Sequence, residues 1–138
     1  MRKFYLDTNI FLNVLFEEKE LYKSSETLLS KSGINFKCIT SLLTLMEIHR
    51  VLQKQGAKDH QIEEAINKIT KLDIEMLIPE SHNFINAYEI VKKLKIDTDD
   101  AIHLAIAIDN EAELITRDAV FAKRSEQIIS VITPEKII

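Results

Sequence analysis

Short apolar runs alternate with longer amphipathic segments along the whole chain, and this alternation limits the fold more than any other feature. The short runs have the length and composition of β-strands, whereas the longer segments repeat apolar residues at the spacing of a helix face. Short strands separated by helices are typical of a parallel sheet with helices on both faces. We therefore expect an α/β fold. The expected strands cover residues 3–6, 36–39, 74–78, 113–115 and 129–132.

The expected helices occupy the segments between these strands, and residues that favour helix ends mark several of their boundaries. Thr40 or Ser41 precedes one helix and Gly56 follows it, as is typical of an N-cap and a C-terminal glycine. Asp59 and Ser81 are expected to cap two further helices. The expected helices cover residues 9–16, 20–31, 41–54, 59–72, 81–94, 98–110 and 120–123, and Pro134 begins a terminal helical turn.

Composition narrows the class of protein. Of the 138 residues, 46% are hydrophobic and 29% are charged, so the chain can bury a core without disulfides. It has only two glycines and two prolines, with no repeat and no linker, and we expect one domain over residues 1–138. Because there is one cysteine, an internal disulfide is excluded, and we expect Cys38 to be a buried side chain in a strand.

The net charge of −4 argues against a protein that binds nucleic acid through bulk positive charge. It does not exclude a nuclease, because the carboxylates of a metal site add negative charges that bound divalent cations neutralise. Asp7 interrupts the N-terminal apolar run before it reaches the length of a signal sequence, and no segment approaches the ~20 apolar residues of a membrane helix. We therefore expect a cytoplasmic protein.

Two acidic residues directly follow expected strands, at the sheet edge where α/β proteins bind ligands. Asp7 follows the first strand, and Asp118 ends the turn after the fourth. Each also has an ordinary structural interpretation, because an Asp at such a place often caps the next helix or closes a turn. Thr8 could cap the helix after Asp7 instead, which would free the Asp7 carboxylate for another role.

Glu47 lies in a segment that is otherwise apolar on nearly every face, which is typical of a helix that is buried or lies at an interface. A buried carboxylate is unfavourable unless it is paired or binds a metal ion. Two interpretations of Glu47 are therefore equally reasonable: a metal ligand, or one half of an ion pair with Arg50, three residues further on, or with a lysine elsewhere.

Asp100 belongs to a group of acids at the start of another apolar helix. Acids in a first helical turn stabilise the helix dipole, but three acids among four residues exceed what capping requires. His103 lies one turn after Asp100 on the same helix face. We expect His103 to pack or to form hydrogen bonds and do not assign it as a metal ligand.

The combination of four carboxylates is more informative than any one of them. A parallel α/β fold can bring two acids that follow strands and two acids from helices to one edge, where a divalent cation would remove their mutual repulsion. Mg²⁺ and Mn²⁺ prefer oxygen ligands, and either ion can activate water and stabilise charge on a phosphodiester. The chain has no Gly-rich phosphate loop, no paired cysteines and no Gly-x-Ser-x-Gly element, so other common chemistries lack their residues.

With these residues in this order, the sequence resembles the PIN-domain family, in particular the toxin ribonucleases of VapBC toxin–antitoxin systems. The similarity spans almost the whole chain. It rests on Leu6-Asp7-Thr8-Asn9, on Thr40-Ser41, on Glu47 with Arg50-Val51-Leu52, on Asp100-Ala101-Ile102-His103-Leu104-Ala105, and on Ile115-Thr116-Arg117-Asp118 with Phe121.

The resemblance implies a three-layer α/β/α PIN-like fold with a short, mainly parallel central sheet. It further implies a metal-dependent endoribonuclease that binds Mg²⁺ or Mn²⁺, acts on RNA, forms a homodimer and is inhibited by a cognate antitoxin protein. The residues that it implies as catalytic residues and metal ligands are Asp7, Glu47, Asp100 and Asp118. Thr8, Asn9 and Thr116 would support this site, Asn9 by hydrogen bonding.

One position departs from the family pattern. Family members often carry a further acid two residues after the one that matches Asp118, and here that residue is Val120. Asp97 and Asp99 are acids nearby, but we do not assign them to the site. The absence of an acid at Val120 puts in doubt the binding of a second metal ion, rather than catalysis itself.

Three other classes of protein are alternatives to the toxin. A PIN-like fold without activity could bind RNA or a protein partner, and a housekeeping PIN nuclease could process RNA, although such nucleases usually carry further domains. A phosphotransfer receiver domain with Asp7 as acceptor would need a neighbouring acid before the end of the first strand and a lysine after the last strand. Neither is in the right place.

Overall fold

The computed structural model describes residues 1–137 and has a five-stranded sheet at its centre. The sheet has the strand order β3-β2-β1-β4-β5, and every neighbouring pair is parallel. The central strand is β1, where Phe4 pairs with Cys38 of β2 on one side and with Glu113 of β4 on the other. The strands are β1 (Lys3–Leu6), β2 (Lys37–Ser41), β3 (Ile74–Leu77), β4 (Glu113–Ile115) and β5 (Val131–Ile132).

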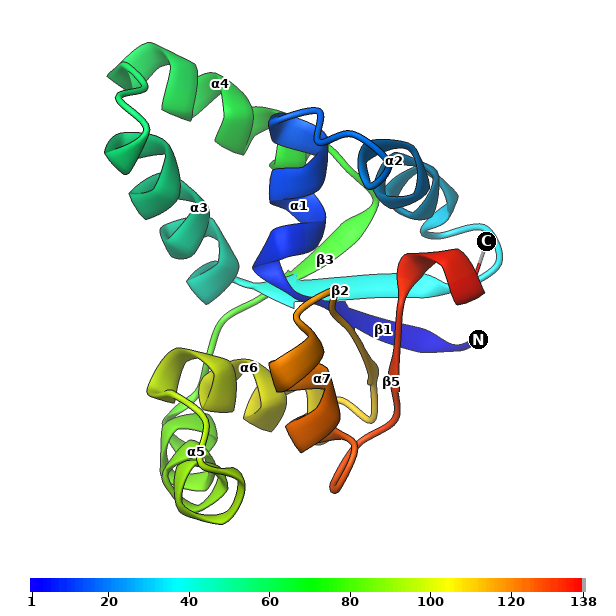
Figure 1. Ribbon diagram of the computed structural model, residues 1–138, viewed down its shortest axis with the longest axis vertical. Helices are drawn as coiled ribbons and strands as arrows, with labels where there is room; N and C mark the ends of the chain where they lie inside the picture. The colour runs from blue at the N-terminus through cyan, green and yellow to red at the C-terminus, as the bar shows by residue number, and fades with distance from the viewer. Residues whose placement is uncertain (138) are drawn as a thin grey trace.

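Helices cover both faces of this sheet, as Figure 1 shows: α1 to α4 lie on one side of it, and α5 to α7 lie on the other. The α/β/α layering and the all-parallel sheet confirm the fold expected from the alternation of segments. The helices are α1 (Thr8–Leu15), α2 (Tyr22–Lys31), α3 (Leu42–Lys54), α4 (Asp59–Thr70), α5 (Ser81–Leu94), α6 (Thr98–Asp109) and α7 (Ala119–Ser125), and a 3₁₀ turn covers Pro134–Lys136.

Alternation along the strands divides the interior into two cores. Phe4 and Leu6 of β1 join the core beneath α1 to α4, whereas Tyr5 between them joins the core beneath α5 to α7. Successive side chains of a strand point to opposite faces, so a central strand must be apolar at every position. Cys38 is fully buried in β2, as expected.

Two of the expected helix caps are wrong by one residue. Lys58 and Glu80 hold the N-cap positions of α4 and α5, so Asp59 and Ser81 are the first residues inside these helices. The reason lies two residues further along each helix. The side chains of Gln61 and Asn83 accept hydrogen bonds from the backbone N–H groups of Lys58 and Glu80, both at 2.8 Å, and draw those residues into the cap.

The topology brings several chain ends to one edge of the sheet. Because the strands are parallel, the carboxyl ends of β1, β2 and β4 meet there, and α1, α3 and α7 begin directly or shortly after these strands. Ligand sites of open α/β sheets form at such an edge. Over residues 1–137, no helix is long and apolar enough to cross a membrane.

Candidate metal centre

Asp7 lies where β1 becomes α1. Its backbone N–H donates to the carbonyl of Ile115 at 3.0 Å, which ties the end of β1 to the end of β4. The two carboxylate oxygens have different partners: Oδ1 accepts from the Thr8 backbone N–H at 2.8 Å, and Oδ2 accepts from Thr116 Oγ1 at 2.7 Å. Asp7 is therefore the N-cap of α1, one of the two residues considered for that position, and Thr8 is the first residue of the helix.

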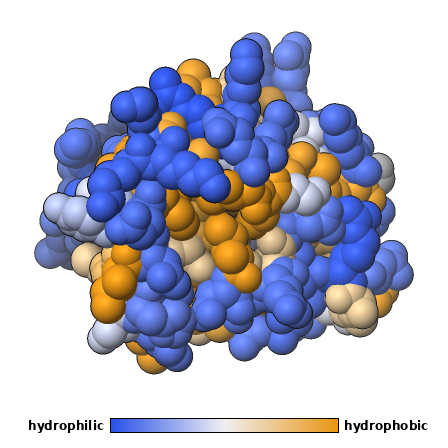
Figure 2. All heavy atoms as spheres, turned by 90° about the horizontal axis from the view of Figure 1, so that it is seen from below, coloured by the Kyte–Doolittle hydropathy of each residue, from blue (hydrophilic) through white to orange (hydrophobic). Residues whose placement is uncertain are grey.

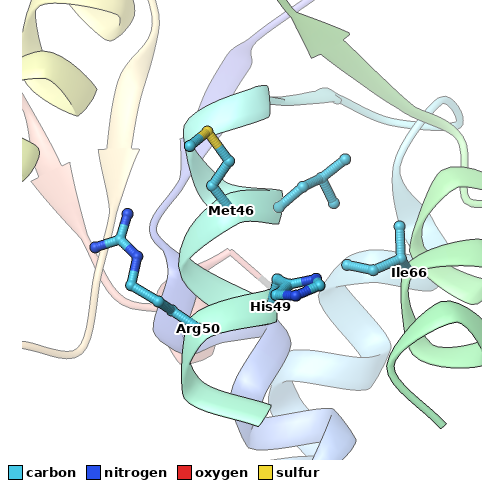
Figure 3. A pocket seen from close by; sticks show the side chains of 5 residues that line it. Met46, His49, Arg50 and Ile66 are labelled. Carbon is cyan, nitrogen blue, oxygen red and sulfur yellow. The ribbon is translucent and has the colours of Figure 1, made fainter. Parts of the chain in front are cut away.

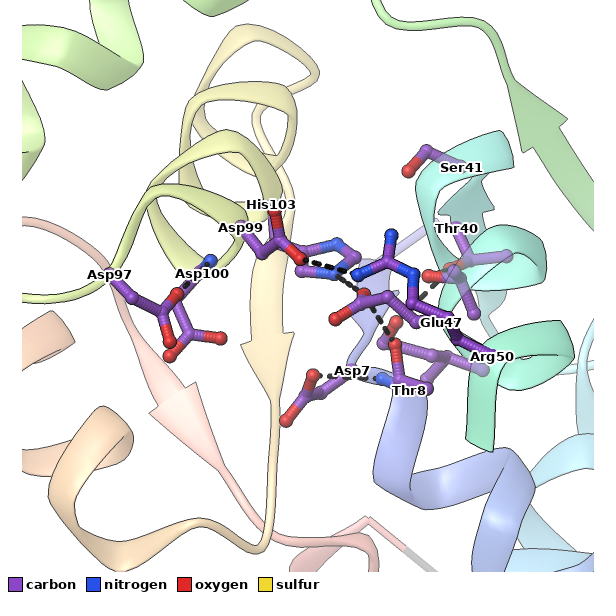
Figure 4. A network of polar contacts seen from close by, with 12 residues as sticks. Asp7, Thr8, Thr40, Ser41, Glu47, Arg50, Asp97, Asp99, Asp100 and His103 are labelled. Carbon is purple, nitrogen blue, oxygen red and sulfur yellow. Dashed lines mark hydrogen bonds and ion pairs between the residues drawn. The ribbon is translucent and has the colours of Figure 1, made fainter. Parts of the chain in front are cut away.

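Glu47 extends from α3 towards the start of α1 and the first turns of α6 (Figure 4). Its Oε1 accepts hydrogen bonds from Thr8 Oγ1 at 2.9 Å and from Nε2 of His103. Arg50, the alternative partner in the sequence, lies instead 3.7 Å from the Asp99 carboxylate. With Oε1 held by two donors, Glu47 keeps one defined orientation.

His103 forms hydrogen bonds, as expected, but the sequence analysis did not identify Glu47 as its partner. It is fully buried, with Nε2 at Glu47 and Nδ1 hydrogen-bonded with the Tyr5 hydroxyl at 2.6 Å. Tyr5 in turn hydrogen-bonds with Ser41 Oγ at 2.8 Å. The signal in the sequence was the position of His103 one turn after Asp100, but the contact to Glu47 joins residues 56 positions apart.

Asp100 is half-buried in the first turn of α6, and its backbone N–H donates to Oδ1 of Asp97, the N-cap of that helix, at 2.9 Å. Asp118 is the N-cap of α7, where its Oδ1 accepts from the backbone N–H groups of Val120 and Phe121, both at 3.1 Å. Asp100 and Asp118 line a common cavity between α6 and α7.

The ionisation of these acids shows that they act on one another. Burial, followed by the charges of Asp97 and Asp7 and, more weakly, of Asp118, raises the pKa of Asp100 to about 7. Burial also raises the pKa of Asp7, with a further contribution from Glu47. The four predicted ligands therefore form one connected group of carboxylates, and a cation would relieve their repulsion.

Glu47 and His103 shift each other's pKa in opposite directions. Burial would raise the pKa of Glu47, but the hydrogen bond and the charge of His103 hold that pKa below its ordinary value. Burial would likewise lower the pKa of His103, and its hydrogen bond to Glu47 together with the charge of Glu47 raises that pKa instead. The pair therefore favours an ionised Glu47 carboxylate.

These residues fit a divalent cation by their chemistry, because a set of carboxylate oxygens without cysteine suits Mg²⁺ or Mn²⁺. They do not form a closed ligand set in this structure: among residues 1–137, no three Asp, Glu, His or Cys side chains lie close enough together to hold a metal ion. Figure 4 shows Asp7, Glu47 and Asp100 around the same space, so a shared cation would need these side chains to move closer together.

The three supporting residues take different places. Thr8 and Thr116 are buried and donate to Glu47 and Asp7, respectively. Asn9 is exposed on α1 and forms no side-chain hydrogen bond within the described part of the chain. Val120, which stands where relatives often carry an acid, is largely exposed on α7.

Arg117 holds the loop between Thr116 and Asp118 in place. Its guanidinium donates to Glu135 through two nitrogens at 2.8 and 2.6 Å, to Asn13 Oδ1 at 2.9 Å and to Ser24 Oγ at 2.6 Å. The Arg117 side chain is only 12% exposed, whereas that of Glu135 is 49% exposed, so the two bonds to Glu135 lie at the protein surface. Arg117 thus joins the site loop to α1, α2 and the C-terminal turn.

Comparisons with known proteins agree on the fold. The family model described as "PIN domain" matches residues 4–127. The chain is similar to the structure of VapBC2 from Rickettsia felis bound to a promoter DNA fragment, with 20% identity and a TM-score of 0.73 over 95% of this chain and 98% of that chain.

Two further structures are similar to the same extent. A toxin–antitoxin complex from Klebsiella pneumoniae has 25% identity and a TM-score of 0.71, over 94% of this chain and 96% of that one. VapC20 from Mycobacterium tuberculosis, a toxin that cleaves the Sarcin-Ricin loop, has 13% identity and a TM-score of 0.72, over 87% and 93%. No curated protein sequence matches the chain.

Proposed function

The chain belongs to the PIN domain family, and from this premise we propose that residues 1–138 form one metal-dependent endoribonuclease domain, the toxin of a type II toxin–antitoxin pair. The observation that carries the proposal is the group of carboxylates at the carboxyl edge of the sheet, where Asp7 and Asp118 follow β1 and β4 and Glu47 and Asp100 lie on α3 and α6. The similarity to toxin–antitoxin structures supports the assignment to this class.

The four carboxylates would hold Mg²⁺ or Mn²⁺. When bound, such an ion lowers the pKa of a coordinated water and stabilises charge on the phosphate that is attacked. The protein's own contribution is orientation. Thr116 and the start of α1 fix Asp7, while Thr8 and His103 fix Oε1 of Glu47.

An antitoxin partner is part of the proposal, and the groove between α3 and α4 is our candidate surface for it. Met46 is 59% exposed there, and Figure 3 shows His49 of α3 and Ile66 of α4 facing each other across the groove. The cavity measures about 380 Å³ and is lined mainly by apolar side chains. An apolar groove rimmed by polar residues is typical of a protein-binding surface.

A second apolar surface suits the proposed homodimer. Phe84, Ile85 and Tyr88 of α5 are each more than half exposed. Figure 2, which views the molecule from below Figure 1 where α5 lies lowest, shows apolar atoms gathered among hydrophilic ones on this face. Such exposed groups of large apolar side chains are uncommon on monomers.

An RNA cleavage assay tests the proposed activity. The wild-type protein should cleave RNA with Mg²⁺ or Mn²⁺ and stop in EDTA, and Asp7→Asn should lose at least about a hundredfold in rate. Asp59→Asn is the matched control, because Asp59 is an exposed acid in the first turn of α4, away from the site. Cleavage that persists in EDTA and in Asp7→Asn would refute the proposal.

Growth experiments test the proposed class of protein. Expression of the wild-type chain alone should arrest growth, and co-expression of the antitoxin should restore it. A metal-dependent nuclease that leaves growth unaffected would be a housekeeping RNA-processing enzyme, and a protein that binds RNA without cleaving it would be a non-catalytic module.

A further inference from the structure

Arg124 differs from the other arginines of the chain in its partners. The guanidinium groups of Arg2, Arg50 and Arg117 each lie within 4 Å of a carboxylate, at Glu113, Asp99 and Glu135, respectively. Arg124 has no such partner among residues 1–137 and instead donates to the backbone carbonyl of Lys95. Its charge is thus held in place without being neutralised by an acid.

This guanidinium borders the cavity that contains Asp100 and Asp118. The cavity, about 190 Å³ in volume, lies between the loop before α6 and helix α7. Lys95, an exposed residue that forms the C-cap of α5, also lines the cavity, and its backbone carbonyl accepts the hydrogen bond from Arg124. Neither Lys95 nor Arg124 forms an ion pair within 4 Å in the described chain.

The lining of the cavity changes character along α7. Asp118 caps the helix, Val120 and Phe121 follow in its first turn, and Arg124 comes one turn after Val120 on the same face. Along α7, starting from the carboxylates, the cavity is therefore lined first by an acidic group, then by apolar groups and then by a basic group. A nucleotide strand has a matching sequence of phosphate, sugar or base, and next phosphate.

We propose that Arg124, assisted by Lys95, binds a backbone phosphate of the RNA strand next to the phosphate that is cleaved. The inference rests on the proposed nuclease function and adds to it the path of the substrate, along α7. The need for such a site follows from charge: the chain is net negative and its site is acidic, so an RNA strand requires local cations to lie beside it. A guanidinium suits this role because its planar donors match phosphate oxygens.

The test measures RNA binding, not cleavage. A fluorescein-labelled, unstructured 20-nucleotide RNA is titrated with the Asp7→Asn protein in Mg²⁺ from 50 to 300 mM KCl, with anisotropy as the readout. Addition of Arg124→Gln should weaken binding by roughly three- to tenfold at low salt, and the slope of log K against log [KCl] should fall in magnitude by about 0.7, the value of one lost single-strand phosphate contact.

The matched control is Lys123→Gln, which removes the same charge from the neighbouring residue of α7 that does not line the cavity. It should change affinity by less than about twofold and leave the slope unchanged. Arg124→Lys keeps the charge, and should keep most of the slope while losing part of the affinity.

Two results would overturn the inference. One is an unchanged slope in Arg124→Gln, which would show that any loss of affinity is structural. The other is an equal effect of Lys123→Gln, which would show a general charge effect. If the Asp7→Asn protein binds no RNA, the inference falls as well, and metal-dependent cleavage by the wild type then decides separately whether the proposed nuclease function stands.

Discussion

Asp100→Asn is expected to stabilise the metal-free protein. Burial and the charges of Asp97 and Asp7 raise the pKa of Asp100 from 3.8 to about 7 in the folded protein. Because the folded-state pKa lies above the unfolded-state pKa, ionisation of this carboxyl opposes folding. The penalty is absent below pH 3.8, grows as the pH rises, and is complete above pH 7.

The rise in the pKa of Asp100 sets the size of the expected gain in stability. At about 1.4 kcal/mol per pKa unit, it corresponds to roughly 4 kcal/mol at full strength. Asp100 is only half-buried, and solvent screening reduces this to about 1–2 kcal/mol. Asn has the same shape without the charge, and the backbone N–H at this position still donates to Asp97. The free energy of unfolding should therefore rise by about 1–2 kcal/mol at pH 8.

Urea denaturation in EDTA, followed by circular dichroism, measures this change. At pH 5 the gain should be about a third of that at pH 8, because pH 5 lies about a third of the way from 3.8 to 7. Asp99→Asn is the control, since it removes an acid from the same helical turn that pairs with Arg50 outside the carboxylate group. It should be neutral or slightly destabilising.

Bound metal should make the wild type more stable than Asp100→Asn, the reverse of their order in EDTA. Mg²⁺ should stabilise the wild type by mass action and Asp100→Asn much less, because the variant lacks a ligand. If Asp100→Asn destabilises the protein in EDTA, or if its gain is the same at pH 5 and pH 8, the carboxylates do not repel one another as the structure implies.

Three further predictions concern residues around the site. His103→Leu removes a donor from Glu47 and should lower Mn²⁺ affinity, measured by calorimetry, by about 10- to 100-fold. His103→Gln should restore part of the lost affinity, and equal affinities of the wild type and His103→Leu would exclude a positioning role. Arg117→Gln, which loses both bonds to Glu135, should lower the free energy of unfolding in urea by about 1–3 kcal/mol, and a loss below 0.5 kcal/mol would contradict this. Met46→Glu should abolish rescue of growth by the antitoxin while RNA cleavage persists, and full rescue would exclude the groove between α3 and α4.

The sequence predicted the fold well because its signals are local. Every strand was expected within a few residues of its place, since each is a short apolar run between helices with clear periodicity. Cap positions were less certain. At Asp59 and Ser81, the side chain of the third helical residue moved the cap by one position, and no single residue type in the sequence reveals that competition.

The candidate site was predictable only in part. Acids that follow strands can be placed at a sheet edge from topology alone, which is why Asp7 and Asp118 stood out. The partners of Glu47 could not be predicted, because Arg50, three residues away, was the obvious candidate and His103, 56 residues away, is the observed one. Contacts between distant segments depend on how α3 and α6 pack, which periodicity does not encode.

Anomalous diffraction from crystals soaked in Mn²⁺ tests the central claim most directly. The account predicts one strong peak among the carboxylates of Asp7, Glu47, Asp100 and Asp118, with oxygen ligands at about 2.1 Å after side-chain rotation closes the set. A peak bound elsewhere on the protein, or no peak in crystals where these carboxylates are accessible, would contradict it.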